Sequence, residues 1–536
     1  MTTVRSMIIL MLTALMTLGF ASPSHGAEYY VDAAGGNDAA AGTRSAPWQT
    51  VARVNRAALT AGSTVYFKAG GSYLSKLLVP QSGSPDRPVT YTSYGTGAKP
   101  ELTGFNATGK SWTRASNLSF SSGAVIINLS GADHVTVDDC TLYSTATKWT
   151  PPITIQKNAR YNRITNCTIT QEAGNCDTIN LRGNADYNLI QGNTITVGGI
   201  HAAIDLEGHT GGGGTAHYNI IRNNVITGTR GAGALITLQA NSSYNVIEGN
   251  TLTGDDTTAR YCGTNRHARH QCMMKVVSMH NIVRNNIIKG YPCKDSLGLT
   301  LEAYRAGGFS NLASGNHVYN NVITGILVGG TPLFLGENGT GGKTFDNIFK
   351  NNIIYNNGGV HYQTHLDGRW PSETRNVQMR VQASPNVYNN SFRNNLFYKA
   401  GVSGVLWLRD AYYSVAQAEA MNPKLFSGNL QTDPVLDQAT LRPGADSPVR
   451  GAGAALTVIT SPSGYGSTLT VADAYYFSAG LGLVPGDTIQ INRERVAIKE
   501  IDYPSHTLTL ARPITWKQGD AVNLPFSGAA PDLGLL

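Results

Sequence analysis

The stretch YNLIQGNTIT, at residues 187–196, returns with small changes along the chain and decides the fold. Four other clear copies are YNRITNCTIT at 161–170, YNIIRNNVIT at 218–227, YNVIEGNTLT at 244–253 and HNIVRNNIIK at 280–289. Weaker copies begin at residues 315, 346 and 389. The first Asn of successive copies is separated by intervals that run from 26 residues (Asn162 to Asn188) to 36 residues (Asn245 to Asn281). An internal repeat of this period indicates a solenoid.

Apolar and polar residues alternate within each copy, which is the period of a half-buried strand and not of a helix. Five positions after the first Asn of each copy a second Asn recurs: Asn193, Asn224, Asn250, Asn286, Asn321, Asn352 and Asn395. Stacked coils place equivalent residues about 4.8 Å apart, so these side-chain amides can hydrogen-bond along the stack. The sequence therefore predicts an all-β chain that folds as a parallel β-helix.

A further predicted strand precedes each copy, and its alternation separates inward from outward side chains. In DTINLRGN, at residues 177–184, Ile179 and Leu181 point inward. The outward residues of this and the later strands are Asn180 and Arg182, Asp205 and Glu207, Thr237 and Gln239, Met273 and Lys275, Thr300 and Glu302, and Phe334 and Gly336. One outward face is therefore expected to carry nearly all the charge of these strands.

The repeat also sets the domain organisation, with the β-helix predicted over residues 28–454. Residues 455–525 instead contain segments such as GDTIQINRERVAIKEID, which alternate at period two between Gly-Asp and Pro turns and predict a small antiparallel β unit. Residues 526–536 are interpreted as the end of the closing coil, so the unit is expected to be an insertion. We expect it to cover the open end of the solenoid, with carbohydrate binding as the alternative.

The start of the chain is typical of a secretory signal peptide, which we predict at residues 1–27. Arg5 precedes an apolar run at residues 7–20, and small residues follow around Gly26. An uncleaved anchor is the alternative, although the run is short for a membrane span. No later segment is long and apolar enough to cross a membrane. We therefore expect a secreted or periplasmic protein that is soluble and monomeric.

The formal net charge of +7 favours an acidic ligand. Nucleic acid is not expected, because Lys and Arg are scattered and no recognised binding motif appears. The six cysteines of an exported chain suggest disulfides. Cys262 and Cys272 bracket an insertion and are the favoured pair, whereas Cys140 and Cys167 occupy the ladder position of neighbouring coils and are expected to be either bridged or stacked thiols.

Asp205 and Glu207 lie two residues apart on one predicted strand, so both carboxylates project to the same side. Asn180 is predicted at the position of Asp205 one coil earlier. Oxygen ligands of this kind suit a hard cation, calcium above all. The alternative is a solvated face on which Arg182 pairs with Glu207.

The chain resembles the right-handed parallel β-helix proteins of the pectate lyase-like superfamily, in its repeats and also at residues 29–73 and 432–454, which are similar to that superfamily's opening and closing segments. The resemblance implies a short helix that caps the first coil and an extracellular enzyme acting on polysaccharides. In the chondroitinase B-like and alginate lyase-like families, an Asn and an acid-x-acid pair hold calcium against the substrate carboxylate, a Lys removes the C5 proton and an Arg assists.

That comparison implies a metal site at Asn180, Asp205 and Glu207. It implies Lys275 as the base, with Arg305 and Arg182 as the candidate arginines. Lys275 departs from the family pattern, because it lies two coils beyond Glu207, about 9.5 Å along the axis.

His209 is a second candidate base, because it follows Glu207 and opens the glycine-rich loop EGHTGGGGTAH. Substrate binding is predicted at Glu302 and in the segment HYQTHLDGRW, where Trp370 can stack on a sugar. His365 of the same segment, with His361, is a candidate for sugar contact or zinc binding.

The favoured function is a lyase that cleaves a uronate-containing polysaccharide by β-elimination. The first alternative is a glycoside hydrolase, in which Asp205 with Glu207, or Glu302 with Glu337, supplies the two carboxyl groups. The second alternative is a glycan-binding surface protein without catalysis.

Overall fold

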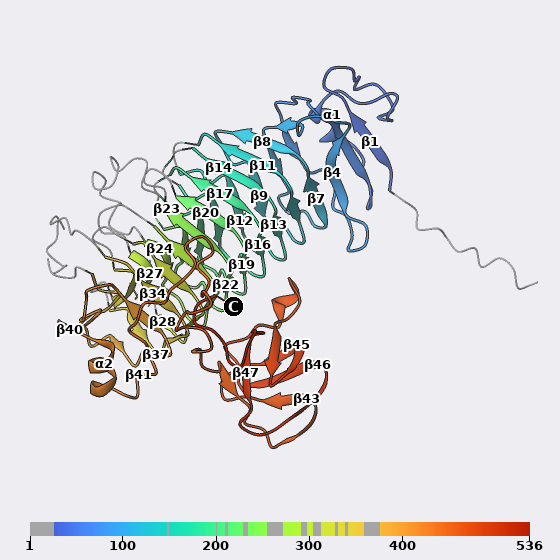
Figure 1. Cartoon of the computed structure of the whole chain (residues 1–536). Helices are drawn as coiled ribbons and strands as arrows, with labels where there is room; N and C mark the ends of the chain where they lie inside the picture. Colours follow the sequence, from blue (N-terminus) through green and yellow to red (C-terminus); the bar gives the residue numbers. More distant parts are fainter. Residues whose placement is uncertain are drawn as a thin grey trace, which may run out of the picture.

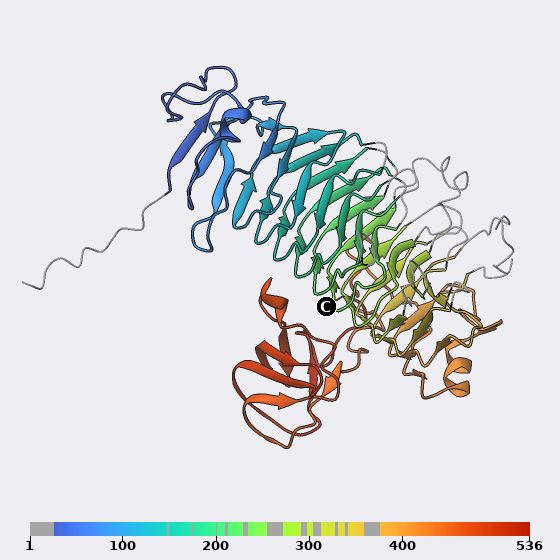
Figure 2. The same ribbon diagram turned by 180° about the vertical axis from the view of Figure 1, so that it is seen from behind.

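The computed structural model describes residues 26–535 except for 147–148, 173, 175, 200, 209–212, 229–233, 255–271, 291–296, 304–311, 327–330, 338–340 and 359–375. Successive coils stack into an elongated solenoid, and a smaller β unit lies beside it (Figures 1 and 2). All neighbouring strands of the coils pair in parallel apart from β39 and β40, so the predicted parallel β-helix is confirmed. The predicted signal peptide lies almost wholly outside the described residues.

Each repeat phrase supplies strands to two sheets, separated by a corner. The first sheet has 14 described strands: β1 (Glu28–Val31), β2 (Thr64–Lys68), β4 (Val89–Tyr94), β7 (Thr113–Ser116), β10 (Thr136–Asp138), β13 (Arg163–Thr165), β16 (Leu189–Gln191), β19 (Ile220–Arg222), β22 (Val246–Glu248), β25 (Ile282–Arg284), β29 (His317–Tyr319), β33 (Ile348–Lys350), β37 (Ser391–Arg393) and β41 (Phe426–Ser427).

The second sheet follows that corner in each coil. Its 11 described strands are β5 (Glu101–Leu102), β8 (Ser119–Ser122), β11 (Thr141–Ser144), β14 (Thr168–Gln171), β17 (Thr194–Val197), β20 (Val225–Gly228), β23 (Thr251–Gly254), β26 (Ile287–Lys289), β30 (Val322–Thr324), β34 (Ile353–Tyr355) and β38 (Leu396–Tyr398). A short additional sheet joins β28 (Leu312–Ser314), β32 (Lys343–Phe345) and β36 (Val387–Tyr388).

The third sheet holds the strands that precede each repeat phrase. Its 13 described strands are β3 (Lys76–Leu78), β6 (Gly104–Asn106), β9 (Ile127–Ser130), β12 (Ile153–Gln156), β15 (Ile179–Arg182), β18 (Ile204–Glu207), β21 (Ile236–Leu238), β24 (Cys272–Val276), β27 (Leu297–Ala303), β31 (Leu333–Glu337), β35 (Met379–Val381), β39 (Leu406–Leu408) and β40 (Ala411–Tyr413). Ile179, Leu181, Ile204 and Leu206 are fully buried in the core between the sheets, as their alternation predicted.

The predicted Asn ladder runs along the corner between the first and second sheets. The Nδ2 of Asn224 donates to the Oδ1 of Asn250 at 3.0 Å, and Asn250 donates in the same way to Asn286. A second ladder, which was not predicted, joins the first Asn of each phrase; for example, Asn188 donates to Asn219 at 3.2 Å. Both ladders are buried and satisfy backbone groups at corners where no sheet pairing is available.

The residue before each ladder Asn adopts a left-handed backbone conformation. At the corner before Asn193 this residue is Gly192 (φ 68°), and before Asn224 it is Asn223 (φ 54°). Glycine and asparagine tolerate this conformation best, which explains why the phrase alternates between Gly-Asn and Asn-Asn.

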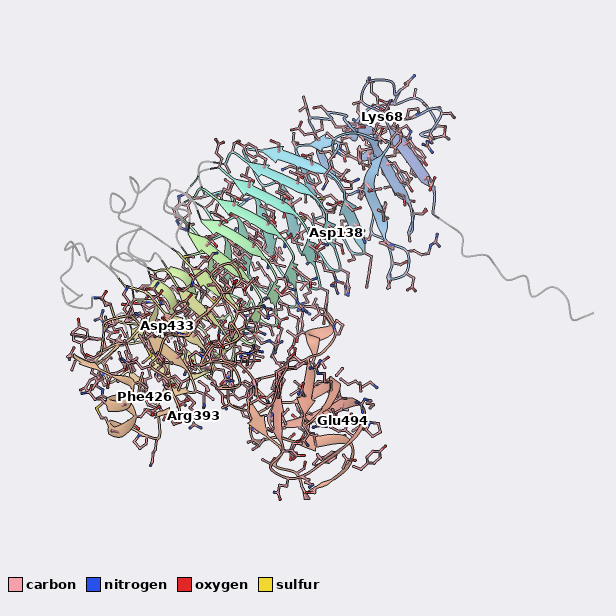
Figure 3. All side chains as sticks on the ribbon, in the orientation of Figure 1. Lys68, Asp138, Arg393, Phe426, Asp433 and Glu494 are labelled. Carbon is pink, nitrogen blue, oxygen red and sulfur yellow. The ribbon has the colours of Figure 1, made fainter. Side chains whose placement is uncertain are left out.

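Both ends of the solenoid carry a short helix. The helix α1 (Val51–Val54) lies at the N-terminal end, as the resemblance implied, and buries Val51 and Val54 in the core. At the other end, α2 (Val415–Met421) is capped by Ser414 and Gln417, and the nearby Phe426 stacks on Phe392. Figure 3 labels Lys68 near the first end and Phe426 near the second.

The C-terminal unit contains six antiparallel strands in the order β42-β47-β44-β45-β46-β43, which confirms the predicted small β unit. They are β42 (Thr457–Val458), β43 (Gly464–Thr470), β44 (Thr488–Ile491), β45 (Glu494–Asp502), β46 (Thr507–Trp516) and β47 (Ala521–Asn523), with a 3-10 turn η2 at Gly480–Gly482. After this unit the chain returns to the solenoid, where Leu533 donates from its backbone to Val449 and Gly534 donates to Asn351.

The expectation that this unit covers the open end of the solenoid is wrong. It packs laterally on the outer face of the first sheet, where Leu189, Ile220, Val246 and Ile282 share one hydrophobic cluster with its core. The unit lies there because it removes these apolar side chains of the first sheet from water.

The cysteines that the structure describes are all buried free thiols. Cys140 and Cys167 are stacked in the ladder, where the backbone N–H of Cys167 donates to Asn193 at 2.9 Å, so the stacked-thiol alternative is confirmed. Cys272 is also a free thiol, contrary to the expected bridge with Cys262, which lies outside the described residues. Within the described residues, no helix has the length and hydrophobicity to span a bilayer.

Candidate functional site

The candidate site lies on the outer face of the third sheet, where parallel pairing aligns one polar side chain per coil. The register places Asn180 opposite Asp205, Asp205 opposite Thr237, Thr237 opposite Lys275 and Lys275 opposite Thr300. Lys275 therefore shares the row of Asp205. In the sequence analysis Lys275 is the second outward residue of its strand, as Glu207 and Gln239 are of theirs. That order predicted Lys275 in their row, which lies two residues along the strand from the row of Asp205.

Three carboxylates form a compact acidic cluster, which we define as Asp177, Asp205 and Glu207. One oxygen from each lies within 4.8 Å of the others. Asp205 and Glu207 come from β18, whereas Asp177 lies in the turn that precedes β15. Sequence reasoning missed Asp177 because the turn interrupts the period-two alternation used to assign outward residues. Its position at the head of DTINLRGN was the only available signal.

Two amide side chains hold the acidic cluster together. Asn180 donates from its Nδ2 to Asp177 and to Glu207, at 3.1 Å in each case. Gln239, on the next coil, donates from its Nε2 to Asp205 at 2.7 Å and to Glu207 at 3.1 Å. The backbone N–H of Ala202 donates to Asp177 at 3.1 Å. These donors orient the carboxylates, but they do not neutralise three neighbouring negative charges.

The cluster is electrostatically strained. Burial and the Glu207 charge raise the pKa of Asp177 to about 7. Burial, together with the charges of Asp177 and Glu207, raises the pKa of Asp205 well above its ordinary value, although the Gln239 hydrogen bond and the Lys275 charge oppose the shift. Carboxyl groups in such surroundings either keep a proton or share a cation.

Two buried oxygen atoms of the site have no hydrogen-bond partner among the described residues: the Oδ1 of Asn180 and the Oδ1 of Asp205. Asn180 is 1% exposed and Asp205 is 4% exposed, so water does not freely solvate them. Buried acceptors without a donor cost stability unless a cation or ordered water is present. Carboxylate and amide oxygens are the ligands that calcium prefers, so the residues of the site fit a hard cation.

Lys275 is the basic residue in the row of Asp205. It is 7% exposed, and its Nζ lies 3.3 Å from the Oε2 of Glu302 on the next coil. The one position between Asp205 and Lys275 in this row is Thr237 on β21, a small side chain. The acidic cluster and the Lys275–Glu302 pair therefore lie on one continuous outer face of the sheet.

The remaining predicted site residues have different positions. Arg182 donates from its Nε to Gln156 at 3.0 Å, on the coil before it. His209, Arg305, Trp370 and His365 lie outside the described residues, and their roles stay predictions.

The proposed carboxyl pair of Glu302 and Glu337 is not supported by the register. Glu302 is opposite Gly336, whereas Glu337 is opposite Ala303, which belongs to the buried core. Because neighbouring positions of a strand point to opposite faces, the two carboxyl groups do not share one face.

The sequence matches the family model described as "Right handed beta helix region" over residues 103–266. Together with the observed pairing, this match gives the solenoid its right-handed assignment. No curated protein sequence matches the chain significantly.

Several solved structures are similar to this chain at low identity. The PL6 family polysaccharide lyase Pedsa3628 from Pseudopedobacter saltans is 17% identical, with 74% of this chain and 95% of that chain covered and a TM-score of 0.46. A mannuronic acid specific PL6 lyase from human gut microbiota is 12% identical, with 74% and 94% covered and a TM-score of 0.38. The GH136 lacto-N-biosidase from Eubacterium ramulus is 13% identical, with 76% and 67% covered and a TM-score of 0.35.

Proposed function

We propose that this protein is a calcium-dependent lyase that cleaves a uronate-containing polysaccharide by β-elimination. The observation that carries the proposal is the acidic cluster, whose three carboxylates lie within 4.8 Å of one another beside unsatisfied oxygens of Asn180 and Asp205. A bound cation would compensate these charges and would attract the carboxylate of an acidic sugar. The same face carries Lys275, a positive group suited to an anionic chain.

Asn180, Asp177, Asp205 and Glu207 would hold the calcium ion. When bound, calcium would neutralise the uronate carboxylate and so make the proton at C5 more acidic. Gln239 and Asn180 keep the carboxylates in place through their amide N–H groups. The role of the protein side chains is thus to fix an anionic sugar next to a base.

In the elimination, a base takes the proton from C5, a double bond forms between C4 and C5, and the C4–O bond breaks. The departing oxygen then takes up a proton. Lys275 forms an ion pair with Glu302, and its Nζ suits a contact to the negative charge that develops on the sugar. We therefore assign charge stabilisation to Lys275 and, from the sequence, proton removal to His209.

A glycoside hydrolase is the second candidate, since it also uses two carboxyl groups. Retaining enzymes separate these groups by about 5–5.5 Å and inverting enzymes by about 6.5–9.5 Å. In the acidic cluster three carboxylates converge, with one oxygen from each within 4.8 Å of the others. Three converging oxygens suit a shared cation, whereas a hydrolase needs only two carboxyl groups, one on each side of a glycosidic bond.

The product distinguishes these functions. Purified protein is incubated with alginate, pectate, glycosaminoglycans and bacterial exopolysaccharides, and ultraviolet absorbance is followed with and without chelator. The proposal predicts unsaturated product from at least one uronate chain, lost on chelation. Reducing ends without new absorbance would indicate a hydrolase instead. Binding without any turnover would indicate a glycan-binding protein.

His209→Ala is expected to reduce turnover by about 100-fold or more, the usual contribution of a general base. Lys275→Ala is expected to reduce turnover while the affinity for calcium is kept. If His209→Ala keeps wild-type turnover, His209 is not the base, and Lys275 becomes the candidate.

We further propose that the chain is exported after removal of residues 1–27. Mass spectrometry of the protein recovered from the expressing cell is expected to find Glu28 at the N-terminus. An intact Met1 on the exported protein would contradict this.

A further inference from the structure

Trp149 is an exposed aromatic side chain close to the acidic cluster. It lies in the turn before β12 and is 67% exposed. Trp48, Trp407 and Trp516, in contrast, are 2%, 6% and 7% exposed. Leaving a large indole ring in water is unfavourable, so an exposed tryptophan next to a polar site suggests a ligand that covers it.

The Trp149 ring is connected to the acidic cluster through His201. The two rings lie 5.1 Å apart at 73°, an edge-to-face contact. The Nδ1 of His201 in turn lies 3.8 Å from the Oδ1 of Asp177. His201 is in the turn before β18, two coils after the turn of Trp149, so the side chains meet from coils about 9.6 Å apart along the stack. This contact orients an otherwise exposed ring beside the proposed calcium site.

Trp149, His201 and Asp177 all lie in turns that enter strands of the third sheet. Trp149 precedes β12, whereas the acidic cluster is on β15 and β18, so Trp149 is on the N-terminal side of the cluster along the solenoid. The Lys275–Glu302 pair is on the opposite side of the cluster, on β24 and β27. An extended ligand that follows the third sheet therefore meets an aromatic ring, an acidic cluster and an ion pair in that order.

We propose that Trp149 forms a stacking subsite for a neighbouring sugar ring of the same polysaccharide chain, next to the sugar held at the acidic cluster. Sugar rings present apolar C–H faces that pack on indole rings, while their hydroxyl groups remain in water. The inference rests on the proposed function, because it takes the acidic cluster as the place where the chain is cleaved. It adds a direction: the polysaccharide extends from the cluster toward the N-terminal coils.

The test compares Trp149→Ala with Trp149→Phe and with Tyr465→Ala. Tyr465 is 73% exposed on β43 of the C-terminal unit, so it is a matched control for the loss of an exposed aromatic ring. Binding of alginate, pectate and glycosaminoglycan oligosaccharides is measured by calorimetry in calcium, and KM and kcat are measured on any polymer that is cleaved. Melting curves show whether each variant folds.

Trp149→Ala is expected to weaken oligosaccharide binding and raise KM roughly tenfold, with kcat and calcium affinity unchanged. Trp149→Phe is expected to keep most of the binding, and Tyr465→Ala to keep all of it. Wild-type binding by Trp149→Ala would overturn the subsite while leaving the lyase proposal intact. If the wild-type protein binds none of the oligosaccharides, the subsite and the proposed function are both overturned.

Discussion

Asn250 illustrates how a single amide connects three coils. Its Oδ1 accepts from the Nδ2 of Asn224 at 3.0 Å, and its Nδ2 donates to the backbone oxygen of Ile221 and to Asn286. The side chain is fully buried, so its loss would remove a hydrogen-bond partner from each of these groups where water cannot replace it. Asn250 contributes to the free energy of unfolding mainly because its removal would leave hydrogen-bonding groups of its neighbours without a partner.

Replacing Asn250 by Leu is therefore expected to lower the free energy of unfolding by about 1–3 kcal/mol, because buried donors and acceptors lose their partners. Denaturant unfolding measures the change. Thr194→Ala is the control, since Thr194 is exposed on β17 and should change stability by less than about 0.5 kcal/mol. Equal stability of the two variants would show that the ladder does not stabilise the solenoid.

At the acidic cluster, Asp205→Asn and Glu207→Gln are expected to weaken calcium binding by roughly 10- to 100-fold or more, since each removes a negative charge and a ligand oxygen. Calorimetric titration with calcium measures the affinity. Asp139→Asn is the control, because the Asp139 side chain is 61% exposed and pairs with Lys99 on another part of the solenoid. Unchanged affinity in both cluster variants would rule out the assigned ligands.

Among the larger elements, the C-terminal unit is joined to the first sheet by a buried ionic network around Arg284. Arg284 of β25 is 3% exposed and bonds to Asp487 of the unit through both terminal nitrogens at 2.6 Å. Its Nε also donates to Glu248 of β22 at 2.7 Å. A buried network of this kind is strongly destabilised when one partner is removed, because the remaining charges lose their compensation.

Arg284→Met is expected to lower the free energy of unfolding by about 3–5 kcal/mol, since it removes the counter-ion of the Asp487 carboxylate and leaves Glu248 with Arg222 alone. Denaturant unfolding again provides the measurement. Arg512→Met should cost no more than about 1 kcal/mol, because the Arg512–Glu494 pair is half exposed. A small effect at Arg284 would mean that this network does not hold the unit in place.

The same network predicts a pH dependence. Burial tends to raise the pKa of Glu248, but the Arg284 and Arg222 charges hold it below its ordinary value of 4.5. The stabilisation from Glu248 is therefore fully present above about pH 4.5 and is lost as the pH falls through the lower folded-state pKa. We expect Glu248→Gln to be less stable than wild type at neutral pH and to approach it in acid. A constant difference from neutral to acid pH would contradict the network's role.

For the whole molecule, the stacking of coils could be predicted from the sequence because every coil repeats the same local chemistry. Asn193, Asn224 and their equivalents mark the corner, and Ile179 and Leu181 mark the inward face. The Asp205 and Asn180 alignment followed from this register. The position of Asp177 could not be predicted in this way, because Asp177 lies in a turn and the alternation of a strand does not extend to it. Only the folded coil brings Asp177 close to Glu207.

The lateral position of the C-terminal unit also escaped prediction, although the sequence holds a signal for it. Leu189 and Ile190, like Ile220 and Ile221, are adjacent apolar residues, so one of each pair faces outward. Such pairs indicate a strand covered on both faces. The covering element is more than 200 residues away in sequence, as the 203-residue separation of Arg284 and Asp487 illustrates, and no local pattern identifies it.

The most direct test of the account is a calcium add-back assay on the cleaved polysaccharide. Wild-type protein is stripped with chelator, and ultraviolet absorbance of unsaturated product is followed before and after calcium is restored, beside Asp205→Asn. We expect no product without calcium, full recovery on addition for the wild-type protein, and little recovery for Asp205→Asn. Full activity of the stripped wild-type protein, or of Asp205→Asn, would contradict it.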